Sequence, residues 1–154
     1  MLKAIAFAAA TLAGTALLAE GHTNPDMVTV ESAHSVIDTL DRMEAAIEEN
    51  GARVFARVDH SRGARSVSMD LPPTELLIFG NPQLGTPAMQ ASRTMGLDLP
   101  LRALAWEHED GTVYVTYPKA EALAATHGVD PESEMMQRIA TALENLVGGA
   151  TAAD

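Results

Sequence analysis

Residues 99–117 read LPLRALAWEHEDGTVYVTY, and this stretch decides the fold class. The Asp110–Gly111 pair is a strong signal for a tight hairpin turn, because both residues tolerate the positive φ that such turns need. After the turn the residue types alternate, so that the valines lie on one side of an extended strand and the threonines lie on the other. Two antiparallel strands are therefore predicted, over 99–108 and 112–117.

Outward from this hairpin, the pattern alternates strands and helices. Apolar residues two apart predict strands, and apolar residues three or four apart predict helices. Polar caps, proline and glycine mark the helix ends. Further strands are expected at 27–32, 53–59 and 75–79. Helices are expected from a Ser35 cap to Gly51, at 61–69, from Thr86–Pro87 to Gly96, at 120–126, and after an Asp130 cap followed by Pro131. Long helices at both ends with a hairpin between them favour an α+β fold, with helices on one face of a mostly antiparallel sheet, over a parallel doubly wound fold.

The strand Glu75–Phe79 (ELLIF) is apolar on both faces. Leu76 and Ile78 point one way, and Leu77 and Phe79 point the other. A strand of this kind is predicted to be buried on both sides. The helices of a small domain can cover one face, so we expect a cavity or a second subunit on the other.

The first 19 residues, MLKAIAFAAATLAGTALLA, have one charge at Lys3, then an apolar run and small residues. This layout is typical of a secretory signal peptide. The apolar run is short for a span of about 20 residues, which disfavours the alternative of an uncleaved membrane anchor. We expect a signal peptide over 1–19, a flexible leader over 20–26, a single domain over 27–147 and a frayed tail over 148–154. The mature protein would be periplasmic or secreted from a bacterium.

The chain carries 21 acidic and 10 basic residues, a formal net charge of −11, and no cysteine. A field of this sign repels phosphates, so neither nucleic acid nor, once the signal is removed, a membrane is expected as a partner. The lack of cysteine excludes disulfides, thiolate catalysis and thiolate metal sites. An exported fold of this composition must be stabilised by packing alone.

Residues 73–90, PTELLIFGNPQLGTPAMQ, carry a resemblance to a known family. Together with His60, the segment 97–102 (LDLPLR) and Trp106–Glu107, they are similar to the domain of unknown function 302 family. The resemblance extends over residues 27–147. It implies a fold similar to the TATA-binding-protein type, a curved antiparallel sheet with helices on one face. It also implies export and a homodimer, whereas the activity of the family is not established.

The Gly80–Pro87 segment is the first candidate site. It joins the apolar strand to a helix start, where free backbone N–H groups and the helix dipole favour an anion. Gly80 and Gly85 allow close approach of a ligand to the backbone, while Asn81 and Thr86 offer side-chain hydrogen bonds. The alternative is that the glycines and the proline only shape the turn and that Thr86 only caps the helix.

His60, Glu75 and Arg102 form the second candidate site. Strand alternation places each of them beside apolar residues, where a polar group must be paired or hydrated. If the three faces coincide, these residues meet at one end of the sheet, where a histidine beside a carboxylate would serve acid–base catalysis. The alternative is a hydrogen-bond network that fixes the strand ends.

A third candidate is a metal site at the hairpin, where residues 107–110 read EHED. Seven of the eight methionines follow the signal segment, which adds soft ligands for copper. The spacing matches no known ligand motif, however, and strand alternation sends Glu107 and His108 to opposite faces. No metal site and no cofactor is therefore predicted.

The favoured function is an exported, non-enzymatic domain that binds a ligand or a partner and forms a homodimer, with a small anionic or polar ligand near Asn81. An enzyme that uses His60 and Glu75 as an acid–base pair is the first alternative. Periplasmic copper or zinc handling is the second.

Overall fold

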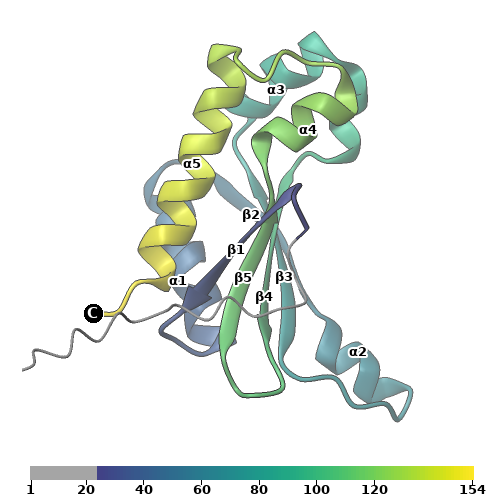
Figure 1. The fold of residues 1–154 in the computed structure, drawn as a ribbon, viewed down its shortest axis with the longest axis vertical. Coiled ribbons are helices and arrows are strands. Elements are labelled where there is room, and N and C mark those ends of the chain that lie inside the picture. Colours follow the sequence, from purple (N-terminus) through teal and green to yellow (C-terminus); the bar gives the residue numbers. More distant parts are fainter. Residues whose placement is uncertain (1–23) are drawn as a thin grey trace, which may run out of the picture.

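The computed structural model describes residues 24–154, so the predicted signal peptide at 1–19 lies outside the described residues. The chain alternates strands and helices in the order shown in Figure 1. The strands are β1 (Met27–Ser32), β2 (Arg53–Asp59), β3 (Thr74–Gly80), β4 (Leu101–Glu107) and β5 (Val113–Pro118). The helices are α1 (Val36–Glu49), α2 (His60–Ser66), α3 (Pro82–Ala91), the short 3-10 helix η1 (Arg93–Leu97), α4 (Ala120–His127) and α5 (Glu134–Thr151).

The five strands form one sheet in the order β1-β5-β4-β3-β2, and every neighbouring pair is antiparallel. The predicted hairpin joins β4 to β5, and Gly111 has the positive φ of 86° that its turn requires. The first strand therefore pairs with the last one along the chain. The predicted α+β class with an antiparallel sheet is confirmed.

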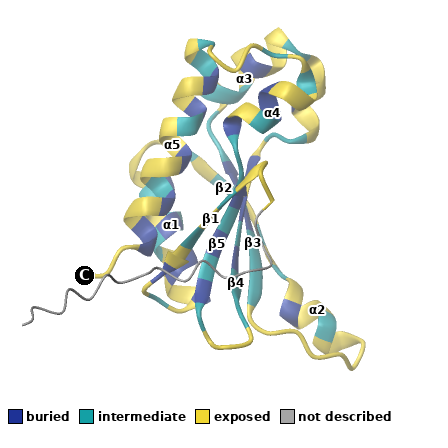
Figure 2. Cartoon of the chain, in the orientation of Figure 1, coloured by how far each residue is buried: buried dark blue, intermediate teal, exposed yellow. Residues whose placement is uncertain are grey.

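The long helices α1 and α5 pack against one another and cover one face of the sheet, as Figure 1 shows. Helices α3 and α4 lie at one end of the sheet, and α2 projects from the opposite end. In Figure 2 the buried residues lie mainly between the sheet and the covering helices. The core there includes Leu40 and Met43 of α1 and Leu143 and Val147 of α5. Burial, with the negative charge of Glu144 as a second cause, raises the pKa of the Tyr117 phenol above its usual value of 10.0.

The strand β3 is buried on one face only, which corrects the prediction of burial on both. Leu77 and Phe79 face the helices and are 0% and 5% exposed. Leu76 and Ile78 lie on the other face of the strand, away from α1 and α5, and remain half-buried. They share that face with Trp106, whose indole Nε1–H donates to Thr116 Oγ1 at 2.9 Å across the sheet. We call this surface the open face.

A β-bulge interrupts the alternation of β2, which was predicted to place Val54, Ala56 and Val58 on one side. Val54 pairs with Phe79 on the helix-covered side, and the register then shifts by one residue. From Ala56 onward the strand has the opposite parity, so Val58 pairs with Leu76 on the open face. The extra residue is Phe55, and a bulge re-aims its side chain in a way that alternation does not predict.

The helix ends agree with the sequence at the first helix and differ at the last. Ser35 caps α1 as predicted, accepting from the Asp38 N–H at 3.1 Å. Helix α5 starts after Ser133 rather than Asp130. The predicted frayed tail is wrong, since α5 continues to Thr151 and the Thr151 carbonyl accepts from Ala33 N at 3.0 Å.

The predicted flexible leader is described only from residue 24 onward. Residues 24–26 form a hydrogen-bonded turn, in which the Asn24 carbonyl accepts from Met27 N at 3.1 Å. The Asp26 carbonyl accepts from Lys119 N at 2.9 Å, which fixes the turn to the chain just after β5. The described end of the leader is therefore part of the fold.

Candidate functional site

The segment after β3 starts a helix five residues earlier than predicted. Asn81 is the N-cap of α3, its side-chain Oδ1 accepts from Gln83 N at 2.9 Å, and Pro82 is the first helical residue. Asn-Pro is a cap followed by an N1 proline, just as Thr-Pro is, and it comes first along the chain. Thr86 and Pro87 consequently lie inside α3 rather than at its start. The Asn81 side chain is engaged in capping, which weakens the case for an anion at this helix end.

A cavity of about 180 Å³ lies beside this segment, where the ends of β2, β3 and β4 meet α3. Gly80, Leu84 and Pro100 are among the residues that line it. The cavity opens beside Phe55, the bulge residue, which is 51% exposed. The full lining consists of Phe55, Gly80, Asn81, Pro82, Leu84, Gly85, Thr86, Met89, Leu99, Pro100, Leu101 and Ile139.

The chemistry of this cavity is apolar. No charged residue is among its lining residues, and Asn81 and Thr86 supply the polar side chains. Both glycines face the opposite wall of the cavity. A Cβ on Gly80 would lie 3.4 Å from the Pro100 Cβ, and a Cβ on Gly85 would lie 3.8 Å from the Leu99 Cδ1. Gly80, Asn81, Gly85 and Thr86 are thus brought together, but around an apolar space. The expected anionic or polar ligand is corrected accordingly.

The wall formed by residues 99–101 is held through the preceding residue, Asp98, by a buried histidine. His127, at the end of α4, has a side chain only 4% exposed, and its Nε2 lies 2.7 Å from Asp98 Oδ2. Its Nδ1 lies 3.0 Å from the Thr94 hydroxyl, and Arg102 forms an ion pair with the same Asp98. This network fixes the chain segment immediately before Leu99 and Pro100. The sequence analysis did not single out His127, since nothing local links it to Asp98.

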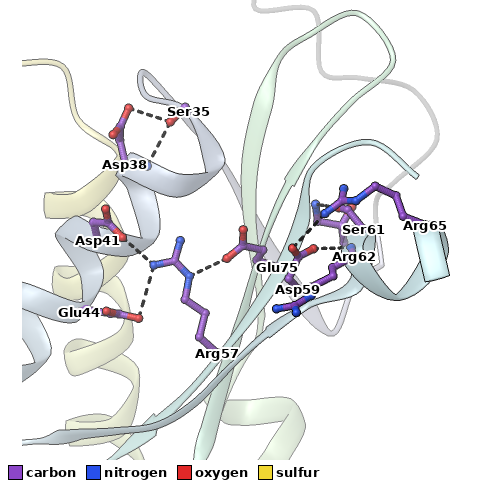
Figure 3. Close-up of polar contacts among 11 residues, drawn as sticks. Ser35, Asp38, Asp41, Glu44, Arg57, Asp59, Ser61, Arg62, Arg65 and Glu75 are labelled. Atoms are coloured by element: carbon purple, nitrogen blue, oxygen red, sulfur yellow. Dashed lines mark hydrogen bonds and ion pairs between the residues drawn. The ribbon is translucent and has the colours of Figure 1, made fainter. Parts of the chain in front are cut away.

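Glu75 belongs to a separate ion-pair network on the helix-covered face, shown in Figure 3. Arg57 on β2 donates from Nε to Glu75 Oε2 at 2.6 Å and from Nη1 to Asp41 Oδ1 on α1 at 2.6 Å. Glu44, one turn further along α1, lies 3.6 Å from the same guanidinium. Partial burial opposes the charge on Arg57, but Asp41 and Glu75 outweigh it and raise the pKa of Arg57 above its usual value. The network ties α1 to the strands β2 and β3.

The second candidate site is not assembled. None of the hydrogen bonds or ion pairs among residues 24–154 joins any two of His60, Glu75 and Arg102. His60 is the exposed first residue of α2, Glu75 lies on the helix-covered face, and Arg102 pairs with Ile78 in the register of the open face. The β3–β4 register places Glu75 and Arg102 on opposite faces of the sheet, and the bulge in β2 separates His60 from the parity of Val54.

The hairpin turn shows local hydrogen bonding rather than a cluster of ligands. Thr112 N–H donates to Asp110 Oδ1 at 2.9 Å, and this bond is the largest cause that lowers the pKa of Asp110 below its usual 3.8. His108 Nδ1 lies 3.2 Å from the same carboxylate. Within the part of the chain that the structure describes, no group of three or more histidine or carboxylate side chains is arranged to hold a metal ion.

The described residues form an α+β domain with an apolar cavity at one end of its sheet. A family model described as "Domain of unknown function DUF302" matches residues 28–146, and the chain belongs to that family. The crystal structure of an uncharacterized conserved protein DUF302 from Bacillus stearothermophilus has the same fold, with a TM-score of 0.67 at 20% identity. The structural alignment covers 82% of this chain and 95% of the Bacillus stearothermophilus chain. The recognition of the family from residues 73–90 is confirmed.

Curated relatives come from the genus Brucella. The chain is 51% identical over 109 residues to "Fluoride-specific ion channel FluC 1" of Brucella suis biovar 1 (strain 1330) and to the protein of the same name from Brucella abortus biovar 1 (strain 9-941). The alignment covers 71% of this chain but 43% and 40% of the two relatives. The chain therefore spans about two fifths of the length of the curated relatives it matches.

These relatives contradict the prediction about partners. A mature chain without membrane association was expected, but the curated relatives are named as ion channels, which are membrane proteins. The charge argument considered only the long-range field of this chain, which says nothing of the membrane-bound proteins to which the chain is similar. The comparisons give no support to the expected homodimer either. In residues 24–154 themselves, none of the helices combines the length and apolarity needed to cross a bilayer.

Proposed function

We propose that this chain is an exported, non-enzymatic binding domain whose ligand is a small apolar molecule. The observation that carries the proposal is the cavity of about 180 Å³ between α3 and the strand ends, with no charged residue in its lining. Ligand sites are typically concave and mostly apolar, with a few polar groups that orient the ligand. Here Thr86 and Asn81 supply those groups.

The size of the cavity limits the ligand. An apolar cavity of roughly 150 Å³ in a protein holds benzene or xenon. A space of about 180 Å³ accordingly suits a single small ring or a short branched chain. Larger ligands would extend past Phe55 and Met89, which flank the opening and are both exposed.

The site has the rigidity that selective binding needs. The end of β3 contributes Gly80 to its lining, and the His127–Asp98–Arg102 network holds the residue just before the wall at 99–101. A preformed cavity loses less conformational entropy on binding than a mobile one. The signal-peptide pattern at 1–19 supports placing this activity in the periplasm or outside the cell.

The direct test is a titration of the protein with benzene, followed by methyl NMR of Leu84, Met89 and Leu99. We expect saturable shifts of these methyl signals. Gly85→Leu, which fills the cavity from α3 beside Leu99, is expected to abolish them. Gly148→Leu is the matched control, because it makes the same change in α5 at an exposed glycine with open space around it.

Two results would overturn the binding proposal. The first is the absence of saturable shifts at these methyls in the unmodified protein. The second is equal binding by the Gly85→Leu variant and the Gly148→Leu control, which would place the ligand elsewhere.

A second candidate function rests on the relatives. The family match spans 28–146, so an alignment of 109 residues necessarily overlaps this domain, and the curated fluoride channels share it. We propose on this ground that the domain works beside a membrane channel and modulates its ion flux, with the cavity as the place where a modulator binds.

This second candidate is tested by fluoride efflux from proteoliposomes. The Brucella suis relative would be compared with a form lacking the segment that aligns with this chain, and with a form in which residues 24–154 of this chain replace that segment. We expect altered flux on deletion and restored flux on replacement. Equal flux in all three proteins would contradict the proposal.

A further inference from the structure

Residues 60–73 form an ordered projection at the end of the sheet opposite to α3 and α4, which we call the hook. It consists of α2 and the segment that returns to β3, and it projects from the sheet away from α1 and α5 (Figures 1 and 2). At its base, the Ser61 hydroxyl donates to the Pro72 carbonyl at 2.9 Å and accepts from Thr74 N at 2.9 Å. These two bonds close the hook against the start of β3.

The turn at the tip of the hook is equally well defined. Helix α2 ends with the two backbone bonds of a Schellman motif, Ser68 N to Arg65 O at 3.2 Å and Met69 N to Ala64 O at 3.0 Å. Ser68 takes the left-handed position of this motif, with φ 58°. The hook is therefore a fixed structure.

Three large apolar side chains are exposed at the tip, where they alternate with Ser68 and Asp70. Val67 is 65% exposed, Met69 is 64% exposed and Leu71 is 42% exposed. In a Schellman motif the residue in the place of Met69 often packs against the end of its own helix, but here Met69 points into solvent. Three large apolar side chains within five residues of an ordered projection form a surface that marks an interaction site.

The charge of the hook differs from that of the rest of the chain. Arg62 and Arg65 on α2 and Asp70 at the tip give residues 60–73 a formal charge of +1, whereas the chain as a whole has a formal net charge of −11. Asp59, the N-cap of α2, accepts from Arg62 N at 2.7 Å and lies 3.4 Å from Arg65. The Arg65 side chain nevertheless stays 62% exposed, so it remains accessible to an external anion.

We propose that the hook is a membrane-contact site for an anionic lipid bilayer. Val67, Met69 and Leu71 would enter the boundary between headgroups and acyl chains, while Arg62 and Arg65 bind lipid phosphates at the surface. This arrangement, with apolar side chains at the tip and cations one turn above, is that of interfacial membrane anchors. The inference goes beyond the proposed ligand binding, because it concerns the opposite end of the sheet and does not use the cavity.

The acidity of the body does not prevent this contact. At physiological ionic strength the field of a charge is screened over a Debye length of about 8 Å. Helix α2 has 7 residues and is about 10 Å long at 1.5 Å per residue. A bilayer at the tip therefore responds mainly to the charges of the hook itself, which are those of Arg62, Arg65 and Asp70, and less to the acidic body about a helix length away.

The absence of native cysteine allows one probe to be placed at a chosen position. Met69→Cys carries a nitroxide at the tip of the hook, and Ile37→Cys, an exposed position on α1, is the control. Each labelled full-length chain is mixed with vesicles of 30% phosphatidylglycerol in phosphatidylcholine, or with phosphatidylcholine alone. The depth of the label is measured from its collisions with oxygen and with a water-soluble nickel chelate.

We expect the label at position 69 to move from water into the apolar region on anionic vesicles, with little change on neutral ones. The label at position 37 is expected to stay in water even if another segment of the chain holds the protein on the vesicle. Replacing Arg62 and Arg65 by glutamine should weaken the insertion at position 69 by roughly fivefold per charge. Urea unfolding of this variant at an unchanged midpoint shows that the fold is intact.

The proposal is overturned if the label at position 69 stays in water on anionic vesicles. It is also overturned if the depth at position 69 is unaffected by the arginine substitutions in a folded variant. Immobilisation of this label by a purified protein partner, without entry into vesicles, would assign the hook to a protein contact instead.

Discussion

The two faces of β3 make a sharp prediction about stability. Leu77 and Leu76 are neighbours on one strand, but Leu77 is fully buried beneath the helices and Leu76 lies half-buried on the open face. Replacing Leu77 by alanine removes three buried carbons, worth about 2.4 kcal/mol in transfer free energy at roughly 0.8 kcal/mol each. The closed cavity left behind brings the expected loss to about 3–4 kcal/mol.

The same substitution at Leu76 is expected to cost much less. Part of that side chain already contacts water, and the space it leaves opens to solvent, so only a fraction of the transfer term is lost, about 1 kcal/mol. The lower strand propensity of alanine acts on both variants alike and cancels in the comparison. The two losses should therefore differ by about 2–3 kcal/mol.

Urea unfolding followed by circular dichroism measures this difference. With a slope of about 1.5–2 kcal/mol per molar urea, the midpoint should fall by roughly 2 M for Leu77→Ala and roughly 0.5 M for Leu76→Ala. Equal midpoints for the two variants would refute the reasoning. They would mean that the open face is covered in solution by something outside residues 24–154.

Three further predictions concern other elements of the fold. Arg57→Met should lower the free energy of unfolding by about 1–2 kcal/mol, because the mostly buried Glu75 carboxylate loses its cation. A double-mutant cycle with Glu75→Gln should give a coupling free energy of about 1 kcal/mol, and additive effects of the two substitutions would contradict this prediction. The raised pKa of Tyr117 means that its unfolded form loses the proton first, so the stabilising contribution is complete below pH 10 and declines as the pH rises through the folded pKa. Unfolding measured from pH 8 to 11 should show a steeper alkaline loss for the unmodified protein and for Tyr114→Phe than for Tyr117→Phe, and identical slopes would exclude this contribution. Ser68→Gly should raise the unfolding free energy by up to about 1 kcal/mol, since glycine takes a positive φ without steric cost; a lower thermal midpoint would argue against the left-handed turn.

Local rules were sufficient for most of the fold. The Asp110–Gly111 turn, the Ser35 cap and the period-two strands each depend on neighbours within a few residues, and the structure has all of them. The start of α3 was misplaced because two cap-and-proline pairs follow one another between residues 81 and 87. Either pair satisfies the local rule, and only tertiary packing chooses between them.

The candidate site was less predictable because it depends on contacts between distant segments. Gly80, Asn81, Gly85 and Thr86 do line one cavity, but part of its apolar lining, such as Phe55, Pro100 and Ile139, lies elsewhere in the chain. Phe55 reaches the cavity through a bulge, which inverts the parity on which the prediction for His60 depended. His127 contacts Asp98, which lies 29 positions earlier in the sequence, and the periodicity of the sequence does not predict a contact over such a separation.

The pairing of β1 with β5 has a consequence for how the chain folds. Residues 27–32 must find residues 113–118, so the sheet lacks its β1 edge until most of the chain is available. Helix α5, which covers the sheet beside β1, comes later still. Closing the long loop that brings β1 to β5 is slow, and apolar strands that stay exposed until it closes favour aggregation. A chain threaded through a membrane from its N-terminus would therefore complete its core only after nearly all of it had crossed, which favours passage in an unfolded state.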